Sequence, residues 1–122
     1  MKEERVKYKE LKEEEKINIE KTLDKYLKNN TKLKISVHAL QRMGERGIRF
    51  KHVKNLIKNK DYFIDSITKD GINTRVSIIS HSPVRNKLHL KLVLCLTNYI
   101  IVTAMVKKLS KEEEGNNEYE RV

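Results

Sequence analysis

Residues 88–97, LHLKLVLCLT, indicate the fold class because their side chains alternate between two kinds. Leucine occupies every even position from 88 to 96, and the odd positions hold His, Lys, Val, Cys and Thr. Successive side chains of a β-strand point to opposite faces, so this alternation predicts a strand whose leucine face is buried. The stretch YIIVTAMVKK follows after a two-residue connection and alternates in the same way. A connection that short predicts an antiparallel pair of strands.

Two further strands and three helices are predicted upstream of this pair. DYFIDSIT and INTRVSIIS have strand periodicity, with HSPVRNK as the loop that follows them. Lys, Glu and Leu dominate residues 3–28, which favours a helix, and FKHVKNLIKN predicts another. The order is therefore that of an α+β fold, with N-terminal helices followed by a four-stranded antiparallel sheet.

A short helix between these two has clear end signals. Ser36 is a favourable N-cap and Gly47 a favourable C′ residue. Val37, Leu40 and Met43 are predicted to form its inner side, opposite His38, Arg42 and Arg46.

These elements divide the chain into three parts. Residues 1–30 are predicted to be a helical extension that docks on the body of the protein or contacts a partner, and residues 31–108 an α+β domain. Residues 109–122 lack apolar periodicity, so we expect a disordered tail.

The positive charge is concentrated in the centre of the chain. Residues 31–106 hold fourteen Lys or Arg against four Asp or Glu, whereas both ends are nearly balanced. This segregation predicts a polyanionic partner, namely RNA or single-stranded nucleic acid. Cys95 is the only cysteine, which favours a reducing, cytoplasmic location, and the most apolar stretch, residues 92–106, is too short to span a bilayer.

The side chains of the centre suit chemistry without a metal ion or cofactor. His38, Arg42 and Arg46 are spaced i, i+4 and i+8, so a helix places them on one side. A histidine can act as general acid or base, and arginines can hold a phosphate, which suffices for RNA cleavage by attack of the 2′-OH. His89 is the candidate for the complementary acid or base. The leading hypothesis is thus a metal-independent endoribonuclease.

A second group of residues is predicted on the sheet face opposite the leucines. Arg75, Lys91, Tyr99 and Thr103 would bind the nucleic-acid backbone there. The same residues also fit a nucleic-acid-binding protein of a phage or mobile element that lacks catalysis, which is the alternative function. A structural reading stays open as well, in which His38 bonds a carbonyl, Arg42 and Arg46 pair with Glu45 or the first helix, and that helix serves protein interaction.

SVHALQRMGERGI followed by HVKNLI resembles the opening signature of a small bacterial and phage domain family of uncharacterised function. That family looks related to the RelE-like toxins within the barnase, EndoU, colicin and RelE-like ribonuclease group. The resemblance covers about residues 35–106 and implies a ribonuclease-type fold, a phosphate site between helices and sheet, and a toxin setting with a protein inhibitor or antitoxin. It extends to His38, Arg42 and Arg46. RelE-like toxins often have an Arg and a Tyr or His late in the chain, where Tyr99 and Thr103 are the candidates here.

Overall fold

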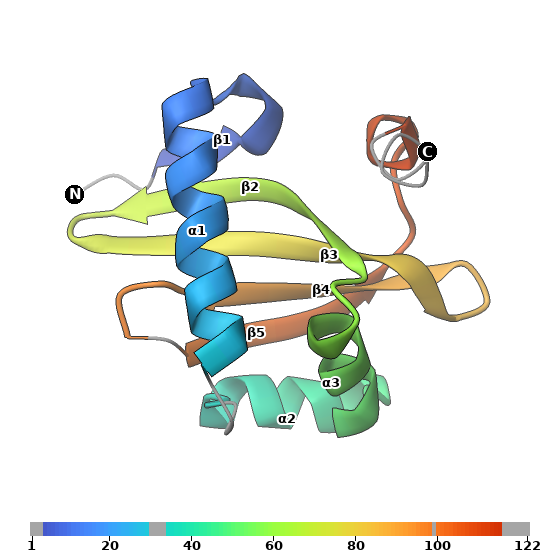
Figure 1. Cartoon of the computed structure of the whole chain (residues 1–122). Coiled ribbons are helices and arrows are strands. Elements are labelled where there is room, and N and C mark those ends of the chain that lie inside the picture. Colours follow the sequence, from blue (N-terminus) through green and yellow to red (C-terminus); the bar gives the residue numbers. More distant parts are fainter. Residues whose placement is uncertain (1–3, 30–33, 99, 116–122) are drawn as a thin grey trace.

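The computed structural model describes residues 4–29, 34–98 and 100–115, and it confirms an α+β fold (Figure 1). Five strands form one sheet in the order β1-β2-β3-β4-β5, and every neighbouring pair is antiparallel. The elements along the chain are β1 (Glu4–Lys7), the 3-10 turn η1 (Tyr8–Glu10), α1 (Glu13–Asn29), α2 (Val37–Arg46), α3 (Phe50–Lys58), β2 (Tyr62–Asp70), β3 (Asn73–Arg85), β4 (Leu88–Cys95) and β5 (Ile100–Lys107).

The prediction of four strands was wrong, because the chain begins with a fifth. β1 pairs with residues 66–69 of β2, with Glu4 opposite Lys69 and Lys7 opposite Ser66. The helix expected from residue 3 begins only at Glu13. Val6 is the one apolar residue in β1, so four residues display neither a helical nor a strand period. Pairing with the edge of β2, a contact distant in sequence, decides the conformation instead.

The loop predicted at HSPVRNK is shorter than expected, because β3 continues through it to Arg85. Pro83 lies between two register shifts in the pairing of β3 with β4. Proline has no N–H to donate, and an irregular position in a strand tolerates that loss. The turn itself lies at Asn86, which adopts a φ of 48°, a left-handed conformation that asparagine tolerates better than most residues.

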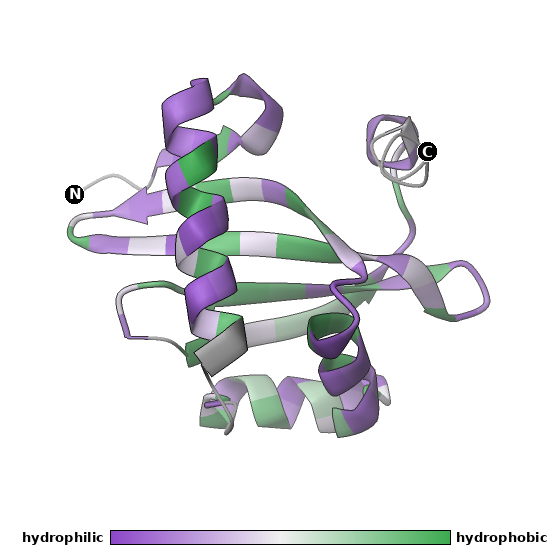
Figure 2. Cartoon of the chain, viewed as in Figure 1, coloured by the Kyte–Doolittle hydropathy of each residue, from purple (hydrophilic) through white to green (hydrophobic). Residues whose placement is uncertain are grey.

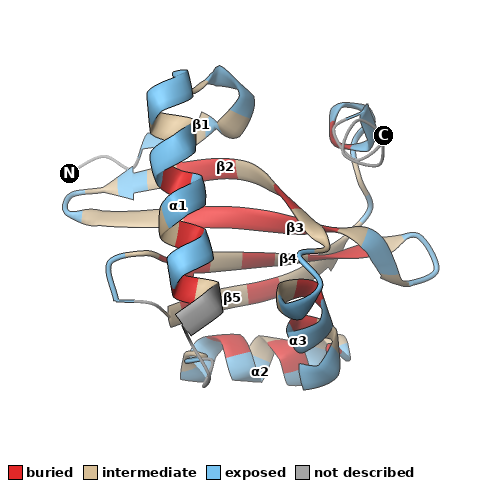
Figure 3. Ribbon diagram, viewed as in Figure 1, coloured by how far each residue is buried: buried red, intermediate tan, exposed pale blue. Residues whose placement is uncertain are grey.

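The core is built from the buried sides of α1, α2 and α3 and from one face of the sheet (Figure 3). Leu90, Leu92 and Leu94 of β4 are fully buried there, so the predicted leucine face is confirmed. Leu23 and Tyr26 of α1 are buried in the same cluster. In Figure 2 the α1 ribbon accordingly alternates between hydrophobic and hydrophilic bands. Of the two alternatives for this helix, the body of the protein or a partner, α1 thus packs on the body, against the sheet.

The described C-terminal part of the chain extends to residue 115. Residues 111–115, which fall in the segment expected to be disordered, form a helical turn. Ser110 and Glu113 bond reciprocally: the Glu113 N–H donates to Ser110 Oγ at 3.1 Å, and the Ser110 N–H donates to Glu113 Oε1 at 2.8 Å. Residues 116–122 lie outside the described part. Within the described ranges, no helix combines the length and apolarity needed to cross a membrane.

Candidate nucleic-acid interface

The ends of α2 are those predicted, but its orientation is not. The Ser36 side chain accepts a hydrogen bond from the Ala39 N–H, and Gly47 ends the helix with a φ of 65°. The buried residues are Ala39 and Met43, whereas Val37 is 82% exposed. The predicted inner side was therefore wrong for Val37, and also for Leu40, which is exposed. The reason lies in the way α2 meets β5.

Segment 34–46 lies along the outer edge of β5 and forms hydrogen bonds with backbone N–H and carbonyl groups of that strand. The Ile101 N–H donates to the Lys34 carbonyl at 2.9 Å, and the Ser36 N–H donates to the Ile101 carbonyl at 3.0 Å. Arg46 Nη1 then donates to the carbonyl oxygen of Ala104 at 2.6 Å, which turns this charged side chain toward the sheet. An edge strand exposes such groups unless something covers them, so α2 protects the edge of β5.

The three residues predicted to act together on α2 have different environments. His38 is exposed. Arg42 Nη1 pairs with Glu45 Oε2 at 3.0 Å, on the surface. Arg46 is part-buried and bonded to β5. The proposed acid or base and the proposed phosphate clamp therefore do not converge on one group of free donors.

His89, the predicted complementary acid or base, is buried within the sheet. It is 9% exposed, and its Nδ1 lies 2.9 Å from the Ser80 carbonyl oxygen. The Ser80 hydroxyl in turn accepts the Leu90 N–H at 2.9 Å. These contacts hold β3 and β4 together, and they place the ring away from the surface.

Three of the four residues predicted on the second sheet face do share a face, and Tyr99 lies outside the described residues. In the register Arg75 is opposite Cys95, Lys91 is opposite Met105, and Thr103 is opposite Val93. The Lys91 side chain is only 14% exposed, and its Nζ lies 3.8 Å from Asp65 Oδ2. Burial lowers the pKa of Lys91, while Asp65 opposes that change. The carboxylate of Asp65 also binds Arg5 at 3.1 Å, so part of this face is closed by its own ion pairs.

An accessible positive surface lies on α3, where the sequence interpretation did not place it. Between Glu45 and Asp61 the chain contains six Lys or Arg and no acidic residue, a signal that a local charge count would have found. Lys51, Lys54 and Lys58 are exposed and spaced i, i+3 and i+7, so they form one row, here called the α3 lysine row. Val53 and Leu56 are buried on the opposite side of the helix. Among the described residues, no carboxylate forms an ion pair with this row.

Phe50 stands beside the α3 lysine row and is 42% exposed. Lys54 Nζ lies 5.1 Å from the centre of its ring, a cation–π distance. An exposed aromatic side chain among cations is the combination with which proteins hold single-stranded nucleic acid.

His52 reports the electrostatic potential at the start of α3. Its Nδ1 accepts the Arg49 N–H at 3.2 Å, an interaction that requires a neutral nitrogen. Burial and the positive charges of Lys51, Arg49 and Arg85 lower the pKa of His52. Arg85 reaches this corner from β3, because its Nη2 donates to the Arg46 carbonyl at 2.6 Å. Three cations thus surround one imidazole, and the potential there is positive.

A family model described as a domain of unknown function, DUF4258, matches residues 35–106. The chain belongs to the DUF4258 family. The predicted membership of a family of uncharacterised function over this range is thereby confirmed, and the link to RelE-like toxins stays a prediction. The matched range contains α2, α3 and strands β2 to β5 up to Val106, while β1 and α1 precede it. No curated protein and no solved structure matches this DUF4258 protein.

Proposed function

We propose that this DUF4258 protein binds RNA or another single-stranded nucleic acid through the α3 lysine row. The observation that carries the proposal is three exposed ammonium groups on one helix face, with no acidic residue between Glu45 and Asp61. Their axial spacings are about 4.5 and 6 Å, from the rise of an α-helix. A row of this kind can follow a phosphate backbone and gains affinity by releasing its counterions.

The geometry favours binding over cleavage. RNA cleavage without a metal needs a base and an acid on either side of one phosphate. His89 is buried, and Arg46 is bonded to β5, so His38 is the one member of the predicted set with an exposed titratable group. The endoribonuclease hypothesis therefore stays a prediction that rests on His38.

The test compares two triple variants of equal charge. The first replaces Lys51, Lys54 and Lys58 with Gln. The matched control replaces Lys12, Lys21 and Lys25 with Gln. These residues are exposed, lie at or near α1, and likewise form no ion pair with another described residue. Fluorescence anisotropy with a labelled single-stranded RNA, measured over a range of salt concentrations, gives the affinity and its salt dependence.

The first variant should bind at least about tenfold more weakly, and the slope of log affinity against log salt should fall by about 2, since each phosphate contact on a single strand contributes about 0.7. The control should keep most of the affinity. An equal loss in both variants would mean that net charge alone attracts the RNA. The same RNA, run on a gel with and without EDTA, should remain intact. Cleavage that disappears in His38→Ala would favour the endoribonuclease instead.

A further inference from the structure

β1 covers only half of the outer edge of β2. It pairs with residues 66–69, and the chain then leaves the strand conformation for η1, which stays close to β2. Residues 62–65 of β2 have no strand beside them on that side among the described residues. Asp65 is the additional residue at a register shift, which lies between Ile64 and Ser66. Among the described residues, the sheet edge therefore has no strand partner over the first four residues of β2, and only η1 lies near it.

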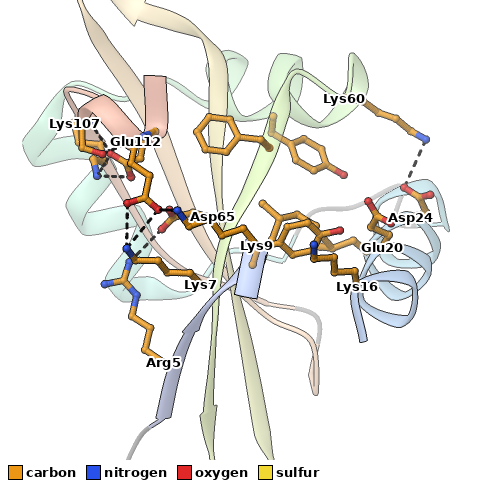
Figure 4. A pocket seen from close by; sticks show the side chains of 17 residues that line it. Arg5, Lys7, Lys9, Lys16, Glu20, Asp24, Lys60, Asp65, Lys107 and Glu112 are labelled. Atoms are coloured by element: carbon orange, nitrogen blue, oxygen red, sulfur yellow. Dashed lines mark hydrogen bonds and ion pairs between the residues drawn. The ribbon is translucent and has the colours of Figure 1, made fainter. Parts of the chain in front are cut away.

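A cleft of about 710 Å³ runs along this open edge (Figure 4). Tyr62, Phe63, Ile64 and Asp65 all line it. Side chains of a strand alternate between the two faces, so a cleft on one face would touch only every second residue. A cleft that touches four consecutive residues follows the edge, where the backbone is accessible.

The hydrogen-bond pattern shows which backbone groups face the cleft. The His81 N–H donates to the Asp61 carbonyl at 3.1 Å, and Phe63 is opposite Ile79 in the same register. Bonded and non-bonded pairs alternate along an antiparallel ladder, so Phe63 is the next residue that bonds to β3. The N–H and C=O groups of Tyr62 and Ile64 then point away from β3, toward the cleft.

The cleft has a wall on each face of the sheet. Figure 4 shows Lys16, Glu20 and Asp24 of α1 on one side, with Lys107 and Glu112 on the other. The second wall belongs to the end of β5 and the C-terminal turn, and Glu112 holds it to Lys7 at 3.1 Å. A cleft with the strand edge between two walls can take an extended chain, which adds to a sheet edge through its backbone.

We propose that this edge binds an extended polar peptide of a protein partner as an added strand beside β2. The walls carry charges of both signs, such as Lys60 and Asp24 at 3.6 Å, so they complement polar side chains at alternate positions of the peptide. A second folded copy does not fit, because the edge it would offer lies between walls of its own. The proposal is independent of the α3 lysine row.

The test uses a phage library that displays linear peptides of about ten residues, the upper end of ordinary strand length. The library is selected for binding to the full-length protein. The most enriched peptide is then synthesised, and backbone amide exchange is measured by NMR with and without it. Exchange at Tyr62 and Ile64 should be fast in the free protein and slow at least about tenfold with the peptide, because each gains a hydrogen bond. Phe63 is the internal control, since its N–H already faces β3.

N-methylation of the peptide tests the register of the added strand. Two peptides are compared, one methylated at its odd-numbered amides and the other at its even-numbered amides. One of them should lose binding and the other should keep it, because only every second N–H faces β2. The variant with Gln at Lys51, Lys54 and Lys58 should bind the peptide with unchanged affinity, which separates this site from RNA binding. The proposal is overturned if Tyr62 and Ile64 are as protected as Phe63 in the free protein. It is also overturned if no library peptide slows their exchange, or if they become protected only as the protein dimerises.

Discussion

Arg46 shows how an arginine in a basic protein can serve the fold. Its guanidinium donates to Ala104 on the edge of β5, and its own carbonyl accepts from Arg85. The residue therefore joins α2 both to β5 and to the end of β3. Arg42, one turn earlier, forms only a surface ion pair with Glu45. An exposed pair of that kind contributes little, because water and salt screen it.

Arg46→Ala should lower the free energy of unfolding by about 1–3 kcal/mol, since a part-buried carbonyl loses a charged donor. Arg42→Ala is the matched control and should change it by less than about 1 kcal/mol. Urea denaturation followed by circular dichroism measures both, and Arg46→Lys should restore part of the loss. A wild-type urea midpoint for Arg46→Ala would contradict the structural role and return Arg46 to the candidate phosphate ligands.

His52 should make the proposed RNA binding depend on pH. Burial and the neighbouring cations lower its pKa in the free protein from the usual 6.5, so the folded state prefers the neutral ring. The stability that this group contributes is present above pH 6.5 and is lost as the pH falls through the lowered pKa. A phosphate bound at Lys51 offsets the positive charge, and it should raise the pKa of His52.

RNA binding should therefore take up a proton, and the affinity should rise as the pH falls below about 6.5. NMR titration of the His52 ring with and without RNA measures the change in pKa directly. His52→Gln should flatten this part of the pH dependence without removing the lysine contacts. An unchanged His52 pKa at saturating RNA would place the nucleic acid away from the start of α3.

At the scale of elements, the sequence predicts those features of a helix or strand that neighbouring residues determine. The caps of α2 at Ser36 and Gly47 and the leucine face of β4 follow from neighbouring residues alone. β1 could not be predicted, because its conformation depends on pairing with residues 66–69. The inner side of α2 was misassigned for the same reason, since a carbonyl of β5, distant in sequence, draws Arg46 inward. The α3 lysine row was visible as a run of basic residues, but its exposure depends on which side of α3 packs.

The C-terminal turn is held to β5 mainly by Glu113. Its carboxylate accepts from Lys107 Nζ at 2.8 Å and from the Ser110 N–H at 2.8 Å. Burial alone would raise the pKa of Glu113, but these hydrogen bonds outweigh it and lower the pKa below its usual 4.5. The contribution to stability is therefore present above about pH 4.5 and is lost as the pH falls through the lowered pKa.

Glu113→Gln should lower the free energy of unfolding at pH 7 by about 2 kcal/mol, as expected for a hydrogen-bonded charged group. The difference from wild type should shrink toward pH 3, where the wild-type carboxyl is protonated as well. Glu112→Gln is the matched control, because that neighbouring side chain is exposed and should cause a much smaller change. Urea denaturation at the two pH values measures the effect. A loss of equal size at pH 3 would mean that Gln disturbs the packing, independently of charge.

At the scale of the whole molecule, the folding unit extends beyond the family match. DUF4258 covers residues 35–106, yet Ile19, Leu23 and Tyr26 of α1 belong to the same buried cluster as the leucines of β4. β1 also completes the sheet beside β2. A protein with so much exposed charge depends on this one core, so α1 cannot be removed without uncovering the sheet.

A chain that starts at residue 34 keeps the entire family match but should not unfold cooperatively. It loses three large buried side chains, and truncating even one such side chain costs about 2–5 kcal/mol, against a total stability of about 5–15 kcal/mol for a typical domain. Leu23→Ala in the full chain tests the same contact without a truncation and should cost about 2–5 kcal/mol, because Leu23 is only 1% exposed. Ile17→Ala, on the exposed side of α1, is the control and should cost less than about 1 kcal/mol.

Thermal melts and urea denaturation compare all four chains. If the truncated chain melts cooperatively at the wild-type temperature, α1 is a separable extension that is free to contact a partner, as its sparse apolar pattern suggests. If it does not, α1 is part of the folding unit, and a partner has only its outer, charged side to bind.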